Sequence, residues 1–390
     1  MGERRILVAA IGVALFFAVG ARASAYVLVD LGTLGGTSSF ALDVNNSRQV
    51  TGNAQLPVGQ PSPRLNTFVF SDSGPMAGLG VLAGSNNFSR GYAINDAGVV
   101  VGESDNNSSR AFVYRNGLLS GLTRLAGDND RGVAHDVNNA GVIVGISSNG
   151  TVSRPTRWVD SGAGYTASDL GTVAGTATAT GRAWSVSQNG VVAGVSTSIL
   201  GTSQATIWSG SSITGLGSLG DGTRFSQAFA VNSGGVAAGS SSTGQTVGQL
   251  LGTTSTTAIT RGFAFSSGVM VELAPVNLFT ATNNGPTANL HSVANDISES
   301  GIIVGNSQRI SGSAALATMW IGGEPVNLNT LIDPGLGWVL TSAEGINDAG
   351  DIVGFGTFGG STRAYLLVIP EPSGLGMLIP AGLLLARRRR

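Results

Sequence analysis

The 390-residue chain contains no cysteine and no lysine, and charged residues make up only 11% of it. Without cysteine, neither disulfide bonds nor thiolate chemistry can contribute. The 60 glycines and the low charge exclude a coiled coil and favour many short strands joined by tight turns. The length fits one to three domains and supplies a sizeable core.

The net charge of −1 conceals a difference between the body of the chain and its ends. Seven of the 21 arginines lie in the ends, which leaves 14 arginines against 20 acidic residues in residues 26–369. A mildly acidic body binds nucleic acid poorly, because phosphate contacts need clustered cations. DNA and RNA are therefore excluded as partners.

The first 25 residues have the order of a secretion signal. Two arginines at positions 4 and 5 precede an apolar stretch, residues 6–19, and Ala23 and Ala25 frame a small-residue cleavage site. The stretch is short for a membrane span, although a permanent anchor is the alternative. Cleavage by signal peptidase would make Tyr26 the first mature residue.

Residues 370–390 form a second targeting segment with three parts. A rigid element of Pro370, Glu371 and Pro372 comes first and an apolar segment, residues 374–386, follows; the chain ends with Arg387, Arg388, Arg389 and Arg390. The apolar segment can enter a bilayer as a helix while the arginines stay on the cytoplasmic side. A plain membrane anchor is the alternative.

This tripartite order resembles the PEP-CTERM sorting signal. The resemblance implies processing of the tail by an exosortase, a membrane protease-transpeptidase. It also implies a Gram-negative bacterium that makes extracellular polysaccharide, and a final location at the envelope surface or outside the cell.

Between the two ends, one unit recurs seven times with constant internal spacing, which is typical of a folded repeat. The copies are ALDVNNSRQVTG, GYAINDAGVVVG, AHDVNNAGVIVG, AWSVSQNGVVAG, AFAVNSGGVAAG, ANDISESGIIVG and AEGINDAGDIVG, which close on Gly52, Gly102, Gly145, Gly194, Gly239, Gly305 and Gly354. Each copy predicts a hairpin whose leading Asn or Ser caps the turn. A left-handed glycine follows in six copies, whereas Arg48 takes its place in the first. Unbroken apolar runs at 99–101 and 142–144 predict strands buried on both faces.

A third strand, usually ending in an aromatic residue, and a fourth strand with a Leu-x-x-Leu pattern follow each hairpin. The last copy lacks the fourth strand, but residues 26–34 carry its pattern ahead of the first hairpin. In a closed ring the opening segment would complete the last blade and remove the exposed edges. We therefore predict an all-β, seven-bladed β-propeller over residues 26–369. An insertion, residues 240–261, is predicted to be a mobile loop in the fifth repeat.

The repeat resembles the HAF family of bacterial extracellular repeats, most clearly in AINDAGVVVGES followed by AFVYRNG. The resemblance implies secretion and a repeated β architecture, and it transfers no catalytic residue.

The sequence offers few groups for chemistry. His135 occupies a repeat column that varies freely and His291 lies between repeats, so neither is expected to be catalytic, and neither has zinc-ligand spacing. Asp43, Asp136 and Asp296 share a column with alanine in other copies, which favours hydrogen bonds to the hairpin backbone. We expect no catalytic residue, no metal centre and no enzyme.

The best candidates for ligand binding are the loops after the fourth strands, because equivalent loops of a propeller lie on one face. Their candidate residues are Asn86, Asn87, Asp128, Asn129, Asp130 and Asp221. Asp128, Asn129 and Asp130 carry oxygens suited to calcium or a glycan, although polar turn residues need no ligand. The leading expectation is a non-catalytic surface or matrix protein associated with extracellular polysaccharide. The alternatives are a carbohydrate-active propeller enzyme, a lyase or glycosidase, and a self-associating coat protein.

Overall fold

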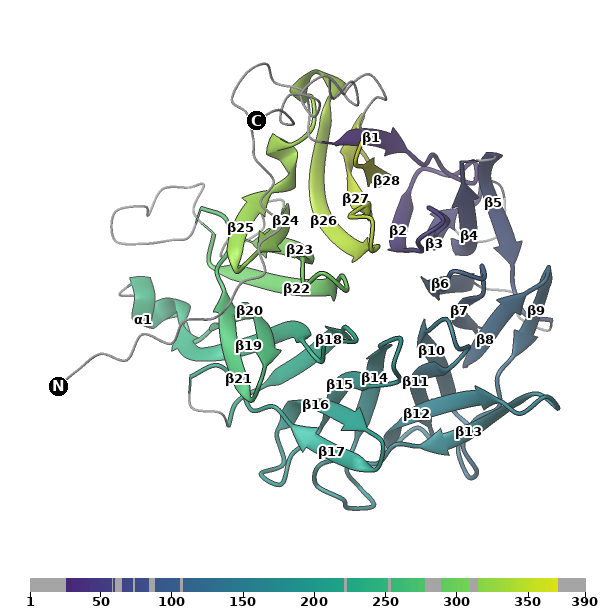
Figure 1. Ribbon diagram of the computed structural model, residues 1–390, viewed down its shortest axis with the longest axis vertical. Coiled ribbons are helices and arrows are strands. Elements are labelled where there is room, and N and C mark those ends of the chain that lie inside the picture. Colours follow the sequence, from purple (N-terminus) through teal and green to yellow (C-terminus); the bar gives the residue numbers. More distant parts are fainter. Residues whose placement is uncertain are drawn as a thin grey trace, which may run out of the picture.

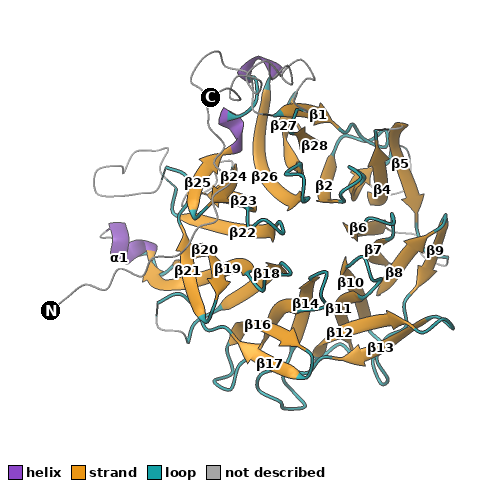
Figure 2. Ribbon diagram, viewed as in Figure 1, coloured by secondary structure: helices purple, strands orange, loops and turns teal. Residues whose placement is uncertain are grey.

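The computed structural model describes residues 26–370 apart from 58, 60–64, 73, 84–87, 106–107, 221–222, 252–253, 278–288 and 309–314. Its strands form seven four-stranded antiparallel sheets, arranged as blades in a circle (Figure 1). Helix is limited in the described residues to α1 (Val247–Leu251) and the 3-10 helices η1 (Leu328–Thr330) and η2 (Pro334–Leu336) (Figure 2). The prediction of an all-β, seven-bladed propeller is confirmed.

Six blades run in sequence order from the innermost to the outermost strand. The first two are β2 (Ser39–Val44), β3 (Val50–Gln55), β4 (Leu65–Ser71), β5 (Gly74–Gly80) and β6 (Phe88–Ile94), β7 (Val100–Asp105), β8 (Ser109–Arg115), β9 (Leu118–Gly121). The next two are β10 (Arg131–Val137), β11 (Ile143–Ser148), β12 (Ser153–Asp160), β13 (Tyr165–Asp169) and β14 (Gly181–Val186), β15 (Val192–Thr197), β16 (Ser203–Ser209), β17 (Ser212–Gly215). The fifth and sixth are β18 (Ser226–Val231), β19 (Ala237–Thr246), β20 (Ala258–Ser266), β21 (Val269–Leu273) and β22 (His291–Ile297), β23 (Ile303–Gln308), β24 (Leu316–Ile321), β25 (Glu324–Asn327).

The seventh blade joins the two ends of the propeller. It contains β26 (Trp338–Ile346), β27 (Ile352–Phe358), β28 (Ser361–Val368) and, as its outer strand, β1 (Val27–Asp30). β1 is antiparallel to β28, with Val27 opposite Val368 and Asp30 opposite Tyr365 (Figure 1). The prediction that the opening segment completes the last blade is confirmed.

The hairpin turns between first and second strands close as predicted. Six of them contain a left-handed glycine, and Arg48 adopts the same region with a φ of 58°. The Oδ1 of Asn45 accepts the N–H groups of Ser47 and Gln49 at 3.0 and 2.8 Å, which caps the turn. Its Nδ2 reaches the next blade and donates to the carbonyl of Asn95 at 2.9 Å.

The same cross-blade hydrogen bond recurs at other asparagines of this column. They are Asn95, Asn138, Asn232 and Asn347, which donate to the carbonyls of Asn138, Ser187, Ser298 and Asn45. The last of these bonds links blade seven to blade one. The repeat asparagine therefore holds its own turn and also joins neighbouring blades.

Apolar side chains are buried mainly between blades. One cluster joins Val101 and Val113 of blade two to Ile143 and Trp158 of blade three. The runs at 99–101 and 142–144 are buried, as predicted. Each blade is thus one layer of a core that only its neighbours complete.

Two details of the predicted blade are wrong. Leu122 and Leu216 follow β9 and β17, which end at Gly121 and Gly215, so their Leu-x-x-Leu patterns lie in the crossing to the next blade. They are buried there because the chain passes between two sheets. The insertion after the fifth hairpin is not simply a loop: it extends β19, forms α1 and contributes to β20.

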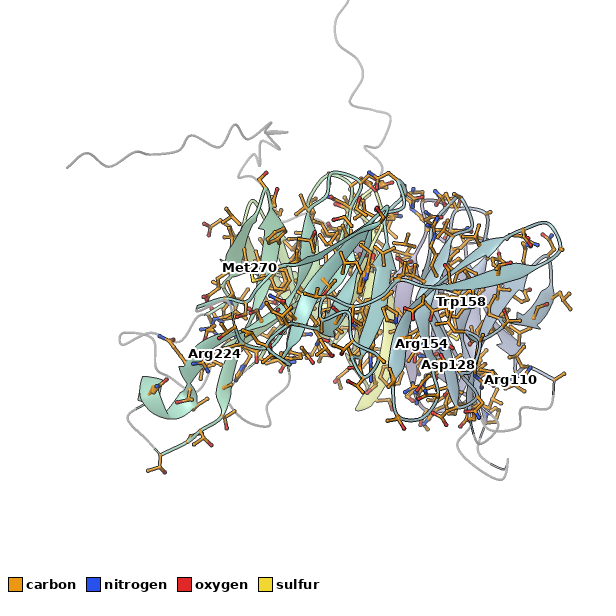
Figure 3. All side chains as sticks on the ribbon, turned by 90° about the horizontal axis from the view of Figure 1, so that it is seen from below. Arg110, Asp128, Arg154, Trp158, Arg224 and Met270 are labelled. Atoms are coloured by element: carbon orange, nitrogen blue, oxygen red, sulfur yellow. The ribbon has the colours of Figure 1, made fainter. Side chains whose placement is uncertain are left out.

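The disc has two faces, which we define by their connections. The turn face carries the hairpins between first and second strands, such as residues 45–49. The loop face carries the connections between blades and between second and third strands. Figure 3 shows the disc from the side, with Arg110, Asp128, Arg154 and Arg224 toward the loop face.

The targeting segments lie almost entirely outside the described residues. Tyr26 is buried beside β28, and Pro370 follows the last strand. Ala23, Ala25, Glu371, Pro372 and Arg387–Arg390 are not described. Among the residues that are described, no helix is long and apolar enough to cross a membrane.

Candidate functional site

Each innermost strand has a β-bulge at the same repeat position. The pairing register shifts there by one residue, which re-aims the side chain of the extra residue. The seven bulged residues are Leu42, Tyr92, His135, Trp184, Phe229, Asn295 and Glu344. The freely varying column of the sequence is therefore the bulge position of the blade.

Four consecutive bulge residues, Tyr92, His135, Trp184 and Phe229, form an aromatic arc across blades two to five. Their ring centres are separated by 5.7, 4.3 and 6.0 Å in that order. Neighbouring blades thus contact one another through these rings on the inner side of the propeller.

The closing glycine of every repeat faces the bulge. A Cβ on Gly145 would lie 1.9 Å from the carbonyl oxygen of Val133, and the other six copies give 1.9 to 2.1 Å. No side chain fits at that distance. The glycine that ends the sequence motif is therefore required by the bulge opposite it.

His135 is packed inside the arc as a neutral imidazole. Its Nδ1 lies 2.8 Å from the carbonyl oxygen of Ala183, which an Nδ1–H can donate to. Burial lowers the pKa of His135 to about 4. His291 lies elsewhere, where its Nδ1 accepts the N–H of Thr260 at 3.1 Å, and burial lowers its pKa as well.

Three aspartates near the turn face clamp adjacent blades. Asp43 accepts the N–H of Val44 and, across the blade boundary, that of Ile94, both at 2.7 Å. Asp136 and Asp296 repeat this arrangement with the next blades. The hydrogen bonding to the hairpin backbone that the sequence favours is present, and it extends to the neighbouring blade.

Burial raises the pKa of all three clamp carboxyls. For Asp43 it does so to about 8, with the charge of Asp296 adding to the effect. Burial raises the pKa of Asp296 to about 7. The folded protein therefore holds protons on these groups that the unfolded chain releases near pH 4.

We expect the contribution of Asp43 to the free energy of unfolding to fall as the pH rises from about 4 to about 8, because the folded state keeps a proton on this carboxyl that the unfolded chain releases. Asp43→Ala should cost about 1–2 kcal/mol at pH 5, where it removes two hydrogen bonds. The substitution should also reduce the slope of the free energy of unfolding against pH by up to about 1.4 kcal/mol per pH unit. Urea unfolding of the parent and the variant between pH 4 and 9 measures the loss of stability and the change in slope. An unchanged slope in the variant would contradict this account.

A small cavity of about 130 Å³ opens at the turn face between the hairpins. The clamp aspartates line it together with exposed turn residues, among them Asp96 and Glu299. Asp96 accepts the N–H of Asn46 at 2.9 Å, and Glu299 accepts that of Ser233 at 2.9 Å, so these carboxylates cap neighbouring turns. Across the described part of the chain, no group of three or more His, Asp or Glu is arranged to hold a metal ion.

The predicted ligand loops are only partly described. Asn86, Asn87 and Asp221 lie outside the described residues. Asp128 is turned inward, where the Nη2 of Arg154 lies 2.7 Å from its Oδ1 and the side chain is almost fully buried. Asn129 and Asp130 are exposed on the connection from β9 to β10. A calcium or glycan role for this loop stays a prediction.

A larger pocket of about 340 Å³ lies on the loop face between the inner strands of blades four and five, β14 and β18. Its lining combines Arg182 and Trp184 of β14 with Phe225, Gln227 and the hydroxyls of Ser153, Thr180, Ser196 and Ser203. We call this the loop-face pocket. Its described lining contains no carboxylate and no histidine.

Sequence reasoning did not single out this pocket. Trp184 belongs to the freely varying repeat column, whose variation indicates packing or surface, and Arg182 lies two residues before it. The available signal was the alternation Arg-x-Trp in the fourth copy, since an arginine two residues before an aromatic bulge lies on the same side of the strand. Only the fold brings Phe225 and Gln227 of the next blade beside them.

No family model and no curated protein matches the sequence. Among solved structures, the chain is similar to the β-propeller domain of the trilobed protease from Pyrococcus furiosus, with 11% identity, 86% of this chain and 96% of that chain covered, and a TM-score of 0.49. The chain is also similar to TolB from Acinetobacter baumannii, with 13% identity, 86% of this chain and 64% of that chain covered, and a TM-score of 0.36. For the six-bladed Aleuria aurantia lectin the identity is 13%, 88% of this chain and 100% of that chain are covered, and the TM-score is 0.30. None of these likenesses bears on function.

Proposed function

We propose that this chain is an exported, non-catalytic surface or matrix protein whose propeller binds an extracellular glycan. The observation that carries the proposal is the loop-face pocket, where aromatic rings stand beside hydroxyl, amide and guanidinium groups. A sugar presents apolar C–H faces and many hydroxyls, so it matches rings and hydrogen-bonding groups together.

The placement of acidic groups supports binding rather than hydrolysis. Glycosidases generally need two facing carboxylates, and the loop-face pocket has none among its described lining residues. The clamp aspartates at the other face already accept two backbone N–H groups each. Glu344 is the single carboxylate among the seven bulge residues.

The proposed location rests on the two ends of the sequence. A signal peptidase would remove residues 1–25, and an exosortase-type enzyme would recognise Pro370, Glu371 and Pro372 and process the tail. The apolar segment would hold the chain in the inner membrane until then. The mature propeller would reach the envelope surface or the extracellular matrix.

A glycan screen tests the proposal directly. The purified full chain should retain neutral and acidic oligosaccharides from extracellular polysaccharides on an array, and Phe225→Ala should reduce that retention. Running the array with and without calcium also tests the predicted role of Asp128, Asn129 and Asp130. If no glycan is retained by the folded protein under either condition, the binding function is wrong.

A further inference from the structure

We propose that the loop-face pocket selects an acidic sugar, a saccharide unit that carries a carboxylate, and that Arg182 recognises its charge. The inference rests on the proposed glycan-binding function. It adds the chemical class of the sugar and the residues that would distinguish it from a neutral one.

Arg182 differs from the other arginines near it on the loop face. Its exposed guanidinium forms no ion pair and no hydrogen bond with the described residues, and it lies 5.9 Å from the ring centre of Trp184. Arg90 and Arg131, in the equivalent strands of blades two and three, both contact Glu103, at 3.5 and 3.3 Å. The guanidinium of Arg182 thus lies over an aromatic ring, and its N–H donors bind no described residue. A guanidinium in this position can donate two parallel hydrogen bonds to a carboxylate.

The electrostatic surroundings favour an anion in this pocket. No acidic side chain is among its described lining residues, so a bound carboxylate meets no repulsion from the walls. The exposed carboxylates of the turn-face cavity, including Asp96 and Glu299, lie at the opposite end of the inner strands. An acidic saccharide would therefore be attracted to the loop face and repelled from the turn face.

The remaining walls match the sugar ring. Phe225 is 45% exposed at the pocket, which leaves its ring available for stacking against C–H groups. Gln227 and Ser203 offer an amide and a hydroxyl for sugar hydroxyls. The Nε1–H of Trp184 is buried without an acceptor among the described residues, an uncommon condition for an indole. A volume of about 340 Å³ is at the small end for ligand sites and fits a short saccharide.

Titration calorimetry of the full chain with an oligomer of galacturonic acid tests the inference. The parent should bind the acid more tightly than its neutral methyl ester. Arg182→Gln should weaken binding of the acid at least about tenfold, since it removes a charge-assisted hydrogen bond, and should bring acid and ester to similar affinity. Arg182→Lys keeps the positive charge but loses the planar pair of N–H donors, so its affinity for the acid should lie between those of the parent and of Arg182→Gln.

Arg110→Gln is the matched control, because it removes the same charge from the loop face outside the pocket (Figure 3). It should leave binding of the acid within about twofold of the parent, and urea midpoints of all variants should show that they are folded. Equal affinity for acid and ester in the parent, or an unaffected Arg182→Gln, would overturn the acidic-sugar inference while glycan binding stands. Competition by equimolar inorganic sulfate would overturn it too, as it would indicate a simple anion site. Failure of the parent to bind any sugar refutes the proposed function itself.

Discussion

A chain that lacks residues 26–31 should lose most of its folding stability and associate with itself. The deletion removes β1 and leaves the edge of β28 without a partner. It also removes Tyr26 and Leu31, which are buried in the clusters on either side of blade seven. Losing two such side chains costs on the order of 5 kcal/mol or more. That is comparable to the whole net stability of an ordinary domain.

Urea unfolding and size-exclusion chromatography measure the effect of this deletion. The shortened chain should unfold at a much lower urea concentration, and its open edge should promote oligomers. A circular permutant is the matched control: it begins at Gly32 and joins Ile369 to Tyr26 by a short turn, since Val27 already lies opposite Val368. The permutant should recover the parental midpoint. Equal midpoints for deletion and parent would show that β1 does not close the ring.

Replacing the closing glycine of one repeat should be nearly as damaging as opening the ring. In Gly145→Ala the added Cβ would overlap the carbonyl oxygen of Val133, with 1.9 Å between the two atoms. The obstacle is backbone, which cannot rotate away as a side chain can. Relief therefore requires the bulge at His135 to shift, along with its contacts to Tyr92 and Trp184. We expect a loss of at least about 3 kcal/mol in the free energy of unfolding.

Gly141→Ala, four residues earlier in the same repeat, gives the comparison. Gly141 has a φ of 76°, and a Cβ there would meet nothing within 4 Å. Its replacement should cost only about 1–2 kcal/mol, the penalty of the left-handed region. Arg48 already tolerates that region in the first copy. Similar losses for the two alanine variants would mean that the bulge does not constrain the glycine.

The turn chemistry of the repeat could be predicted from the sequence because its interactions are local. Asn45 caps its own turn through bonds to residues two and four positions on, and spacing alone reveals that. The bond from its Nδ2 to Asn95 spans 50 residues, and the sequence contains no sign of it. The same limit explains the misplaced leucine pairs, since their burial depends on where the chain crosses between blades.

The candidate site was largely beyond sequence reasoning for a related reason. The sequence predicts that Asp128 offers an exposed oxygen to a ligand. In the fold its carboxylate instead accepts a hydrogen bond from Arg154, 26 residues further along the chain. Arg182 and Phe225 are 43 positions apart in the sequence and attract no notice individually. They become one pocket only when blades four and five lie side by side.

The order of residues by itself determined the blade, the number of blades and the closure by the opening segment. These features follow from periodicity, from turn residues and from an offset in the repeat, all of which are properties of a one-dimensional pattern. The tertiary structure decided which side of each inner strand faces the axis, which carboxyl groups accept backbone amides and where the guanidinium of Arg182 lies relative to the ring of Trp184. Those outcomes depend on one-residue bulges and on contacts between blades, where distances in space are unrelated to distances along the chain.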